Sequence, residues 1–495
     1  MKKLHLSLVT AAACLFATTV SADDAKPKRE LKNNMMEVYN VLPGKANGIT
    51  EAFTDGTFYG RLRMNSFMYD AENPAALDHK VLGVGGSMIY KTKSYEGFSM
   101  TAAGYFSTVP YTDLERSDAP DAKMGNDLFS RYNVLTTDDW TMAVLGQAYL
   151  QYDAGKTTVK LGDQIFESFL TKSNDTKMIP NTFTGLVIEN NDLPQTKVRG
   201  AYFTAQKLRS HTTSHDVITV GTSEYATDPY DKYAGNDDSA VHKGLSYANF
   251  VAAGKDTSHD LIVADLQNKS IENLQVDVTY GSVPGVVSSL TGELNYNIAL
   301  PGGFSLTPGI RHMQQFDNGG GEIGGSSLDG KNVKWSGSTP TYKNNGYKSA
   351  NSLDSSLTMA RLVLKQGALK AQIAYSAVAD EADIVAPWRG FPTGGYTRAM
   401  AQYNWYANTK TTAAEVHYDF GKAKIVSGLY VMVRYAMQDF DEAKINLQSD
   451  SNILHIDVIE KFTPDLYAKF RLGMRDNDVD TQSYNEYRFE LNYLF

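Results

Sequence analysis

Hydrophobic and polar residues alternate along most of the chain, from about residue 57 onward. In the clearest segment the hydrophobic positions are Tyr487, Phe489, Leu491, Tyr493 and Phe495. The positions between and before them are Glu486, Arg488, Glu490 and Asn492. Because successive side chains of a β-strand point to opposite faces, this segment is expected to form a strand with one apolar face and one charged face.

The same alternation marks the segments 58–68 and 466–475. Their polar faces carry Arg61, Arg63 and Asn65, and Lys469, Arg471 and Arg475. Soluble β-sandwiches also alternate, but these segments run for about 10–13 residues, nearer to a tilted membrane strand than to an average strand of ~5–6 residues. Their apolar faces end in Tyr and Phe, which is typical of the aromatic girdles of outer-membrane barrels.

The connections between these segments alternate between tight turns and long polar stretches. The tight turns lie at 154–156, 366–368, 420–422 and 463–465, and the long stretches lie near 109–142, 208–257, 317–352 and 380–410. Short periplasmic turns with longer extracellular loops are typical of outer-membrane barrels. The pattern therefore predicts an all-β fold, a transmembrane antiparallel β-barrel over residues 57–495, preceded by a periplasmic lead-in at 23–56.

The alternation gives about 18 strands, and a barrel of that size leaves an aqueous lumen. A further candidate strand at 246–253 is assigned to the loop that begins near residue 208, because an even number of strands places both termini in the periplasm. The alternative is a barrel of about 16 strands, since the segments near 183–190 and 258–267 alternate weakly.

The composition excludes several other classes of protein. The chain has 495 residues, one cysteine and a net charge of −9. Outside the first 22 residues no apolar run approaches the ~18 residues that a membrane helix needs. A single cysteine excludes a disulfide framework, and an acidic chain is not expected to bind nucleic acid.

Residues 1–22 have the features of a signal peptide. Lys2 and Lys3 precede an apolar stretch at 4–20, and small residues precede the predicted cleavage after Ala22. A lipoprotein anchor would use Cys14, but the usual upstream leucine is absent. Loss of the two lysines changes the net charge from −9 to −11. The mature protein is therefore expected in the outer membrane of a Gram-negative bacterium.

A series of short motifs extends over much of the mature chain. They are ITEAFTDG at 49–56, YGRLR at 59–63, GFS at 97–99, LGQAYLQY at 145–152, KLGDQ at 160–164, MIPNTF at 178–183 and NDLP at 191–194. With these motifs the sequence resembles the OprD-like outer-membrane porins, particularly their Campylobacterota branch. The resemblance implies an opening helix before the first strand, and a third loop that folds into the pore and narrows it.

Barrel closure would place three polar faces side by side, because the last strand must pair with the first to leave no open edge in lipid. With one residue from a nearby strand, these faces carry a predicted basic ladder: Arg61, Arg63, Arg434, Lys469, Arg471, Arg475 and Arg488. Arginine binds carboxylates through a planar fork, so the ladder is expected to guide anionic solutes. The alternative is that these cations only pair with Glu486, Glu490 and Asp457.

The third loop supplies polar residues that are expected to face this ladder. The predicted constriction residues are Glu167, Ser168, Asn174, Asp175, Thr176, Pro180 and Asn181. An acidic loop opposite a basic wall would create a transverse field that orients dipolar solutes. The alternative is that Glu167 and Asp175 only cap turns.

Together these features predict a porin for passive diffusion, with no reaction and no cofactor. The expected solutes are small and hydrophilic, including ions and amino acids, peptides or other carboxylate-bearing nutrients. One alternative is an adhesin or receptor that acts through the long loops. A barrel hydrolase is a weaker alternative. It would need a serine beside His312 or His417, and the sequence places none convincingly beside either histidine. No metal site is expected. His211 and His215 are four residues apart, but they lie in a loop and not on one face of a helix.

The predicted partners follow from the barrel. They are outer-membrane lipid and lipopolysaccharide, the diffusing solutes, and the barrel-assembly machinery, which would act through the strand ending at Phe495. The sequence leaves a monomer and a homotrimer equally open, because apolar outer residues can contact either lipid or another subunit.

Overall fold

The computed structural model describes residues 28–32, 34–221, 240–401, 405–445 and 447–495. The predicted signal peptide at 1–22 lies outside the described residues, and its removal stays a prediction. Within the described part of the chain, no helix is long and apolar enough to cross a membrane.

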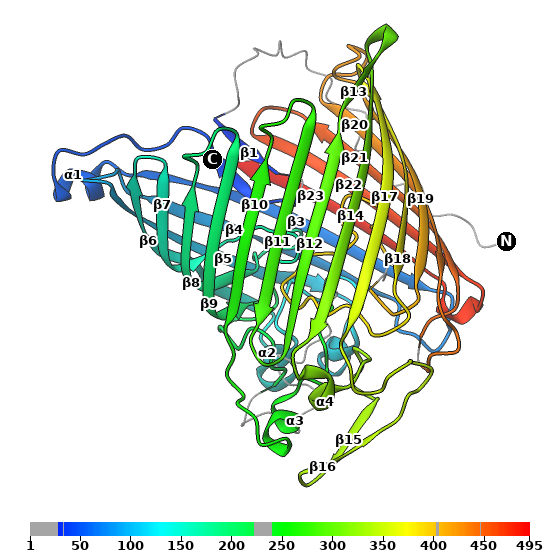
Figure 1. Cartoon of the computed structure of the whole chain (residues 1–495). Helices are drawn as coiled ribbons and strands as arrows, with labels where there is room; N and C mark the ends of the chain where they lie inside the picture. Colours follow the sequence, from blue (N-terminus) through cyan, green and yellow to red (C-terminus); the bar gives the residue numbers. More distant parts are fainter. Residues whose placement is uncertain (1–27, 33, 222–239, 402–404, 446) are drawn as a thin grey trace.

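Eighteen antiparallel strands form a closed barrel (Figure 1). In chain order they are β3 (Thr57–Ala71), β4 (His79–Lys91), β5 (Phe98–Thr112), β6 (Thr141–Ala154), β7 (Thr157–Gln164), β8 (Thr182–Asn190), β9 (Thr196–Lys207), β10 (Leu261–Asn268), β11 (Leu274–Val283), β12 (Val287–Tyr296), β14 (Phe304–Asp317), β17 (Ser355–Gln366), β18 (Leu369–Val378), β19 (Lys410–Asp419), β20 (Leu429–Asp439), β21 (Ser451–Lys461), β22 (Leu466–Asn477) and β23 (Tyr484–Leu494). A short strand, β13 (Ile298–Leu300), extends the edge of β12 and pairs with β14. The predicted fold class is confirmed.

The structure also decides the count of strands. The two weakly alternating segments are the strands β8 and β10, so that the barrel has 18 strands and not 16. The segment 246–253 contains a helix, α3 (Tyr247–Ala252), which lies in the loop between β9 and β10. The prediction that this segment belongs to the loop and not to the barrel is therefore confirmed.

Side-chain alternation separates the lumen from the lipid-facing surface. On β3, Arg61, Arg63 and Asn65 are buried, whereas Leu62 is exposed. Other large hydrophobic residues exposed on the barrel strands include Val84, Met88, Leu145, Leu150, Leu161, Leu186, Ile188, Leu290, Leu294, Ile310, Leu362, Ile373, Val416, Val433 and Met474. Since lipid offers no hydrogen bonds, the closed ladder of backbone pairs is what makes this apolar surface compatible with the membrane.

The seam between β23 and β3 closes the barrel. Leu494 lies opposite Arg61, and Tyr484 lies opposite Ala71. Beyond the last paired position, Phe495 N donates to Gly60 O at 3.0 Å, and Gly60 N donates to Phe495 O at 3.1 Å. On its other side, Gly60 is close to β4: a Cβ at this position would lie 2.2 Å from the backbone oxygen of Ser87, so the close approach of β3 and β4 requires glycine here.

The two ends of the barrel differ in their connections. The helices α2 (Arg131–Thr137), α3 and α4 (Gly320–Gly324) and the hairpin of β15 (Val333–Ser336) and β16 (Thr339–Tyr342) gather at the extracellular end (Figure 1). The extracellular loops are numbered in chain order, and the longer ones are the second (113–140), third (165–181), fourth (208–260), sixth (318–354) and seventh (379–409) loops. The 3₁₀-helices are η1 (Arg116–Asp121), η2 (Pro301–Gly303) and η3 (Asp480–Gln482). The opposite end has short turns.

The segment before the barrel forms a small hairpin and a helix. The hairpin pairs β1 (Arg29–Leu31) with β2 (Glu37–Tyr39), and α1 (Ile49–Thr54) follows just before β3, as the family resemblance implies. Residues of this hairpin reach into the lumen, since Arg61 Nη1 on the barrel wall donates to Met35 O at 2.9 Å. Nothing in the alternation pattern indicates this placement.

Candidate functional site: the pore constriction

The third loop folds into the lumen and ends against β3. Its carboxylate Asp175 lies between two arginines: Arg63 Nη1 donates to Asp175 Oδ1 at 2.8 Å, and Arg61 Nη2 donates to Oδ2. Two positions further along β3, Asn65 Nδ2 donates to Lys177 O at 2.7 Å. All of these side chains are buried. Charge-assisted hydrogen bonds of this kind hold the loop against the wall.

The hairpin β1–β2 covers one of these arginines from another direction. Besides the bond from Arg61 to Met35 O, the Nε of Arg61 lies 3.9 Å from Glu37 Oε2. Ser87 on β4 donates a hydrogen bond to the same carboxylate. As a result the Arg61 side chain is fully enclosed, with 0% of it exposed.

The seventh loop also folds inward and joins the third loop. Lys172 N donates to Trp388 O at 3.0 Å, and Gly390 N donates to Leu170 O at 2.8 Å. The sequence indicated an inward fold for the third loop only. The constriction is therefore built from two loops, and the backbone bonds between them leave no recognisable motif.

A buried carboxylate in the second loop connects the loops of the extracellular half. Asp127 lies 2.7 Å from Arg209 Nη2 of the fourth loop and 3.6 Å from Arg389 Nη2 of the seventh loop. Lys177 of the third loop lies 3.7 Å from the same residue. Four loops thus share one buried acidic group, which keeps them together as a unit.

The predicted loop residues divide into groups with different contacts. Glu167 turns away from the ladder: it accepts hydrogen bonds from Ser173 N at 2.8 Å and from Asn34 Nδ2 of the hairpin at 2.7 Å. Ser168 shares a hydrogen bond of 2.6 Å with Thr171 within the loop. The predicted turn-capping alternative thus describes the contact between Glu167 and Ser173, whereas Asp175 contacts the ladder.

The remaining predicted loop residues support the loop's shape. Arg209 Nη1 donates to Thr176 Oγ1 at 2.9 Å and to Asn174 O at 3.3 Å. Asn181 and the neighbouring Pro180 are buried where the loop returns to β8. Their role in selecting solutes stays a prediction.

On the basic side of the lumen, cations and carboxylates interleave. Glu490 lies between two ladder residues, 3.7 Å from Arg63 Nη2 and 3.5 Å from Arg471 Nη2. Asp457 lies 2.9 Å from Lys469 Nζ and 3.9 Å from Arg471 Nε. Closure of the barrel has therefore brought β22, β23 and β3 together as expected, with acidic groups among the cations.

The other predicted ladder residues also have polar partners. Arg434 Nε donates to Glu415 at 2.7 Å, and Arg488 Nη2 lies 3.3 Å from Glu486. Arg475 Nε donates to an amide oxygen of its own strand at 2.9 Å. The carboxylates named in the pairing alternative lie beside the ladder, and guidance of anionic solutes stays a prediction.

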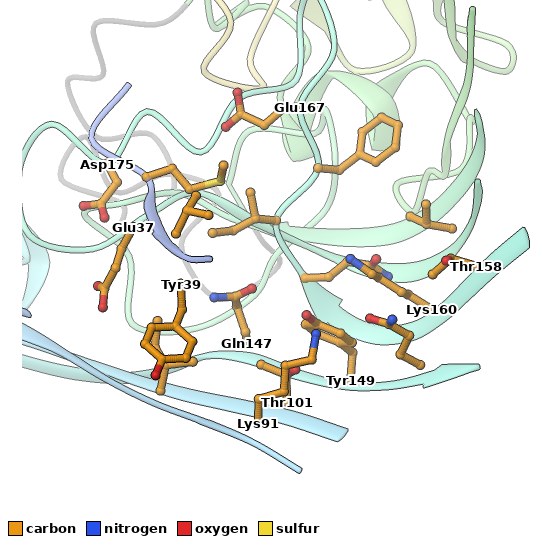
Figure 2. Close-up of a pocket in the computed structure, with 18 of the residues that line it drawn as sticks. Glu37, Tyr39, Lys91, Thr101, Gln147, Tyr149, Thr158, Lys160, Glu167 and Asp175 are labelled. Atoms are coloured by element: carbon orange, nitrogen blue, oxygen red, sulfur yellow. The ribbon is translucent and has the colours of Figure 1, made fainter. Parts of the chain in front are cut away.

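A cavity of about 520 Å³ lies between the hairpin, the third loop and the wall of β3–β9 (Figure 2). The labelled carboxylates Glu37, Asp175 and Glu167 lie on the hairpin and loop side. Lys91 and Lys160 lie on the strand side. Two further charged residues on the strand side have ion-pair partners: Glu189 lies 3.0 Å from Lys197, and Arg199 lies 2.6 Å from Asp265. The rest of the lining is apolar, aromatic or neutral and polar, and includes Tyr39, Tyr59, Thr101, Gln147, Tyr149, Gln151 and Thr158.

The two lysines of this cavity differ from the ladder residues. Among the described residues neither Lys91 nor Lys160 has a carboxylate within ion-pair distance. Lys160 Nζ lies 5.1 Å from the centre of the Tyr149 ring, a cation–π distance. Both side chains are half-buried. They are therefore positive groups that face the open volume.

The sequence model of the outer membrane porin family OprD matches residues 130–494. The chain belongs to the OprD porin family. It is therefore a Gram-negative outer-membrane protein whose outer face meets lipid, and a passive channel for small solutes rather than an enzyme. Its assignment to a Campylobacterota branch stays a prediction.

Solved structures share the fold of this porin at low sequence identity. The crystal structure of OccK9 (OpdG) from Pseudomonas aeruginosa has a TM-score of 0.66 and 16% identity, and the match covers 90% of this chain and 99% of that one. For OpdQ from Pseudomonas aeruginosa the TM-score is 0.63 at 15% identity, with coverage of 90% and 99%. For OccAB1 from Acinetobacter baumannii it is 0.65 at 14% identity, with coverage of 89% and 97%. No curated protein matches the sequence.

Sequence reasoning missed two arginines on the far wall of this porin. Arg311 on β14 and Arg361 on β17 both lie near Glu293, and both stack on the ring of Tyr396 from the seventh loop, at 4.7 Å and 4.4 Å. The alternation of β14 could have identified the first, since Arg311 shares its inward face with the buried Met313. The stacking on a loop residue has no local signal.

In the part of the porin that the structure describes, no group of three His, Cys, Asp or Glu side chains is placed to hold a metal ion. The rings of His211 and His215 lie 4.8 Å apart in the fourth loop and pack edge to face. The pair thus has a packing contact that accounts for its spacing.

Proposed function

We propose that this porin admits small carboxylate-bearing nutrients, chiefly amino acids and short peptides. The cavity has lysines on its strand side and carboxylates on its hairpin and loop side (Figure 2). Opposite charges across a narrow aqueous space create a field that aligns a dipolar solute. A zwitterion can turn its carboxylate toward Lys91 and Lys160 and its ammonium group toward the acidic side.

The observation that carries this proposal is that Lys91 and Lys160 line the cavity and form no ion pair with the described residues. An anion that binds a ladder arginine must compete with an internal carboxylate, such as Asp175 against Arg63. An anion at Lys160 does not compete with a carboxylate of the described residues, so no internal ion pair among them has to be broken there. The aromatic rings beside the lysines can also contact apolar parts of a solute, and OpdK, a structural neighbour with 12% identity, was crystallised with vanillate, an aromatic carboxylate.

Planar-bilayer recordings test the proposal. The solutes compared are a zwitterionic amino acid, a dicarboxylate and an uncharged sugar of similar size, each added as a blocker of the ion current. We expect the amino acid and the dicarboxylate to block at lower concentration than the sugar. Equal block by all three would contradict a preference for carboxylates, and an absence of ion current would contradict channel activity itself.

Further predictions concern assembly and partners. We expect the barrel-assembly machinery to recognise β23 with Phe495, and the outer loops to lie among lipopolysaccharide. Native electrophoresis would distinguish a homotrimer from a monomer. An adhesive role of the long loops is tested by deletion of the β15–β16 hairpin. Loss of cell binding with intact conductance would support adhesion, and unchanged binding would speak against this hairpin as the adhesive element.

A further inference from the structure

The hairpin β1–β2 spans the distance from the periplasmic rim to the third loop. At its start, Arg29 Nη2 lies 3.1 Å from Asp465 in the turn between β21 and β22. After the hairpin, residue 45 forms a backbone bridge with residue 94 in the turn between β4 and β5. Its tip reaches the third loop, where Asn34 Nδ2 donates to Glu167 Oε1 at 2.7 Å. The segment therefore meets the constriction from the end opposite to the extracellular loops.

The hairpin brings a carboxylate to the first arginine of the basic ladder. Glu37 Oε2 lies 3.9 Å from Arg61 Nε, and both side chains are buried. Within the described residues, neither Arg61 Nε nor Glu37 Oε1 has a hydrogen-bond partner. The pair is thus in electrostatic contact, while each side chain keeps unused hydrogen-bonding capacity.

The two acidic neighbours of Arg61 differ in how they are held. Asp175 bonds both Arg61 and Arg63 and belongs to a loop that is joined to three other loops. Glu37 belongs to a hairpin with strands of three residues each, all of them only partly buried. Its main aromatic contact is the stack of Tyr39 on Tyr59, with ring centres 4.9 Å apart. Two arginines donate hydrogen bonds to Asp175, whereas Glu37 lies 3.9 Å from Arg61 Nε, so the carboxylate of Glu37 is the more easily displaced of the two.

We propose that Glu37 is a selectivity-determining residue of this porin, contributed to the constriction by the N-terminal hairpin. Its carboxylate occupies the place beside Arg61 that the carboxylate of a passing solute would otherwise take. With the hairpin in place, the positive field of Arg61 is offset, and the pore discriminates less strongly against cations. The proposal rests on the proposed function, because it assigns the hairpin a role in the same pore.

Ion selectivity in potassium chloride measures this role without any nutrient solute. In Glu37→Gln the charge opposite Arg61 is lost while the side-chain volume is kept. We expect the reversal potential under a salt gradient to shift toward anion selectivity, with the conductance close to that of the wild type. Glu30→Gln is the matched control: it removes a carboxylate from the same hairpin, but one that pairs with Lys32. A shift of equal size in Glu30→Gln, or no shift in Glu37→Gln, would overturn the proposal.

Deletion of residues 28–40 provides a second variant that removes the whole hairpin. We expect a higher single-channel conductance than in the wild type and a shift toward anions at least as large as in Glu37→Gln. Heat-modifiable migration in gels confirms that the barrel has folded. A folded deletion variant with unchanged conductance and selectivity would show that the hairpin takes no part in the constriction. If the channel conducts ions but shows no preference for carboxylates, the proposed function fails while this inference still stands.

Discussion

Two walls of the lumen carry positive charge in different ways. On the wall of β22, β23 and β3, cations lie against carboxylates, as Arg63 does against Asp175 at 2.8 Å and Lys469 against Asp457 at 2.9 Å. On the wall of β4–β7, Lys160 faces the cavity and forms no ion pair with the described residues. Buried charges need partners because an unpaired buried charge is costly. The number of cations on a wall therefore does not show whether a solute can bind there. What matters is whether each cation already has a carboxylate partner.

The strongest test of the paired wall removes its central carboxylate. Asp175→Ala leaves Arg61 and Arg63 buried without the group that both contact, and breaking a buried ion pair from one side costs about 3–5 kcal/mol. We expect a lower thermal unfolding temperature in detergent and faster proteolysis within residues 165–181. Asp192→Ala, in an exposed turn, is the control and should change neither. Unchanged unfolding and cleavage in Asp175→Ala would show that these pairs do not hold the loop.

A second test concerns a histidine that is buried where the fourth loop contacts the sixth loop. In the fourth loop His242 Nε2 lies 2.9 Å from Gly325 O of the sixth loop, and its Nδ1 accepts a hydrogen bond from Gly244 N at 3.2 Å. Burial lowers the pKa of His242 to about 4. When the fourth loop separates from the sixth, His242 is exposed and has an ordinary histidine pKa of about 6.5. As the pH falls, this separated (undocked) state therefore binds a proton at a higher pH than the docked state does. Docking is thus fully stable above that pH and is progressively lost toward pH 4.

Hydrogen exchange of the fourth loop measures this loss. At a pH of about 5 the destabilisation is on the order of 2 kcal/mol, so exchange should be faster than at neutral pH after correction for the intrinsic rate. His242→Gln keeps a polar group without the titration, and the corrected rates at the two pH values should then agree. Equal protection of the wild-type loop at both pH values would contradict the assignment. Because His242 lies on neither wall of the lumen, the sign of the ion selectivity should be the same at neutral pH and at a pH of about 5.

The smallest expected effect compares one cation from each wall. Lys160→Ala removes a charge in contact with water, worth about 1 kcal/mol or less to a nearby ion. We expect its reversal potential to shift toward cations by more than that of Lys469→Ala, because the charge of Lys469 is already offset by Asp457. Shifts of equal size in the two variants would contradict the distinction between the walls.

Local alternation predicted the faces of the strands, since it depends only on neighbouring positions in the chain. Arg63 and Arg471 were placed on the lumen side for this reason, and closure then brought their strands together. The third loop's inward fold came from family resemblance. The sequence could not distinguish Glu167 from Asp175, because the difference between them is set by contacts with distant segments.

The placement of the hairpin and of the seventh loop had no such signal. The hairpin is held by Arg61 and by Glu167, residues far along the chain, and its own strands are too short to show a pattern. The seventh loop is held by backbone hydrogen bonds, such as that from Gly390 N to Leu170 O. Backbone groups are the same in every residue type, so such contacts leave little trace in the sequence.

The seam between β23 and β3 also governs the order in which the barrel can form. Every other pair of neighbouring barrel strands is separated along the chain by a turn or by one loop, whereas Leu494 must find Arg61 across nearly the whole barrel. Contacts of such long sequence separation are slow, since the entropy of closing the intervening chain must be overcome first. Until then the sheet has two free edges. A side chain at Gly60 would therefore disturb two steps of folding: the early pairing of β3 with β4, where it would meet the backbone oxygen of Ser87, and the late closure of the seam, where it would meet the ring of Phe495.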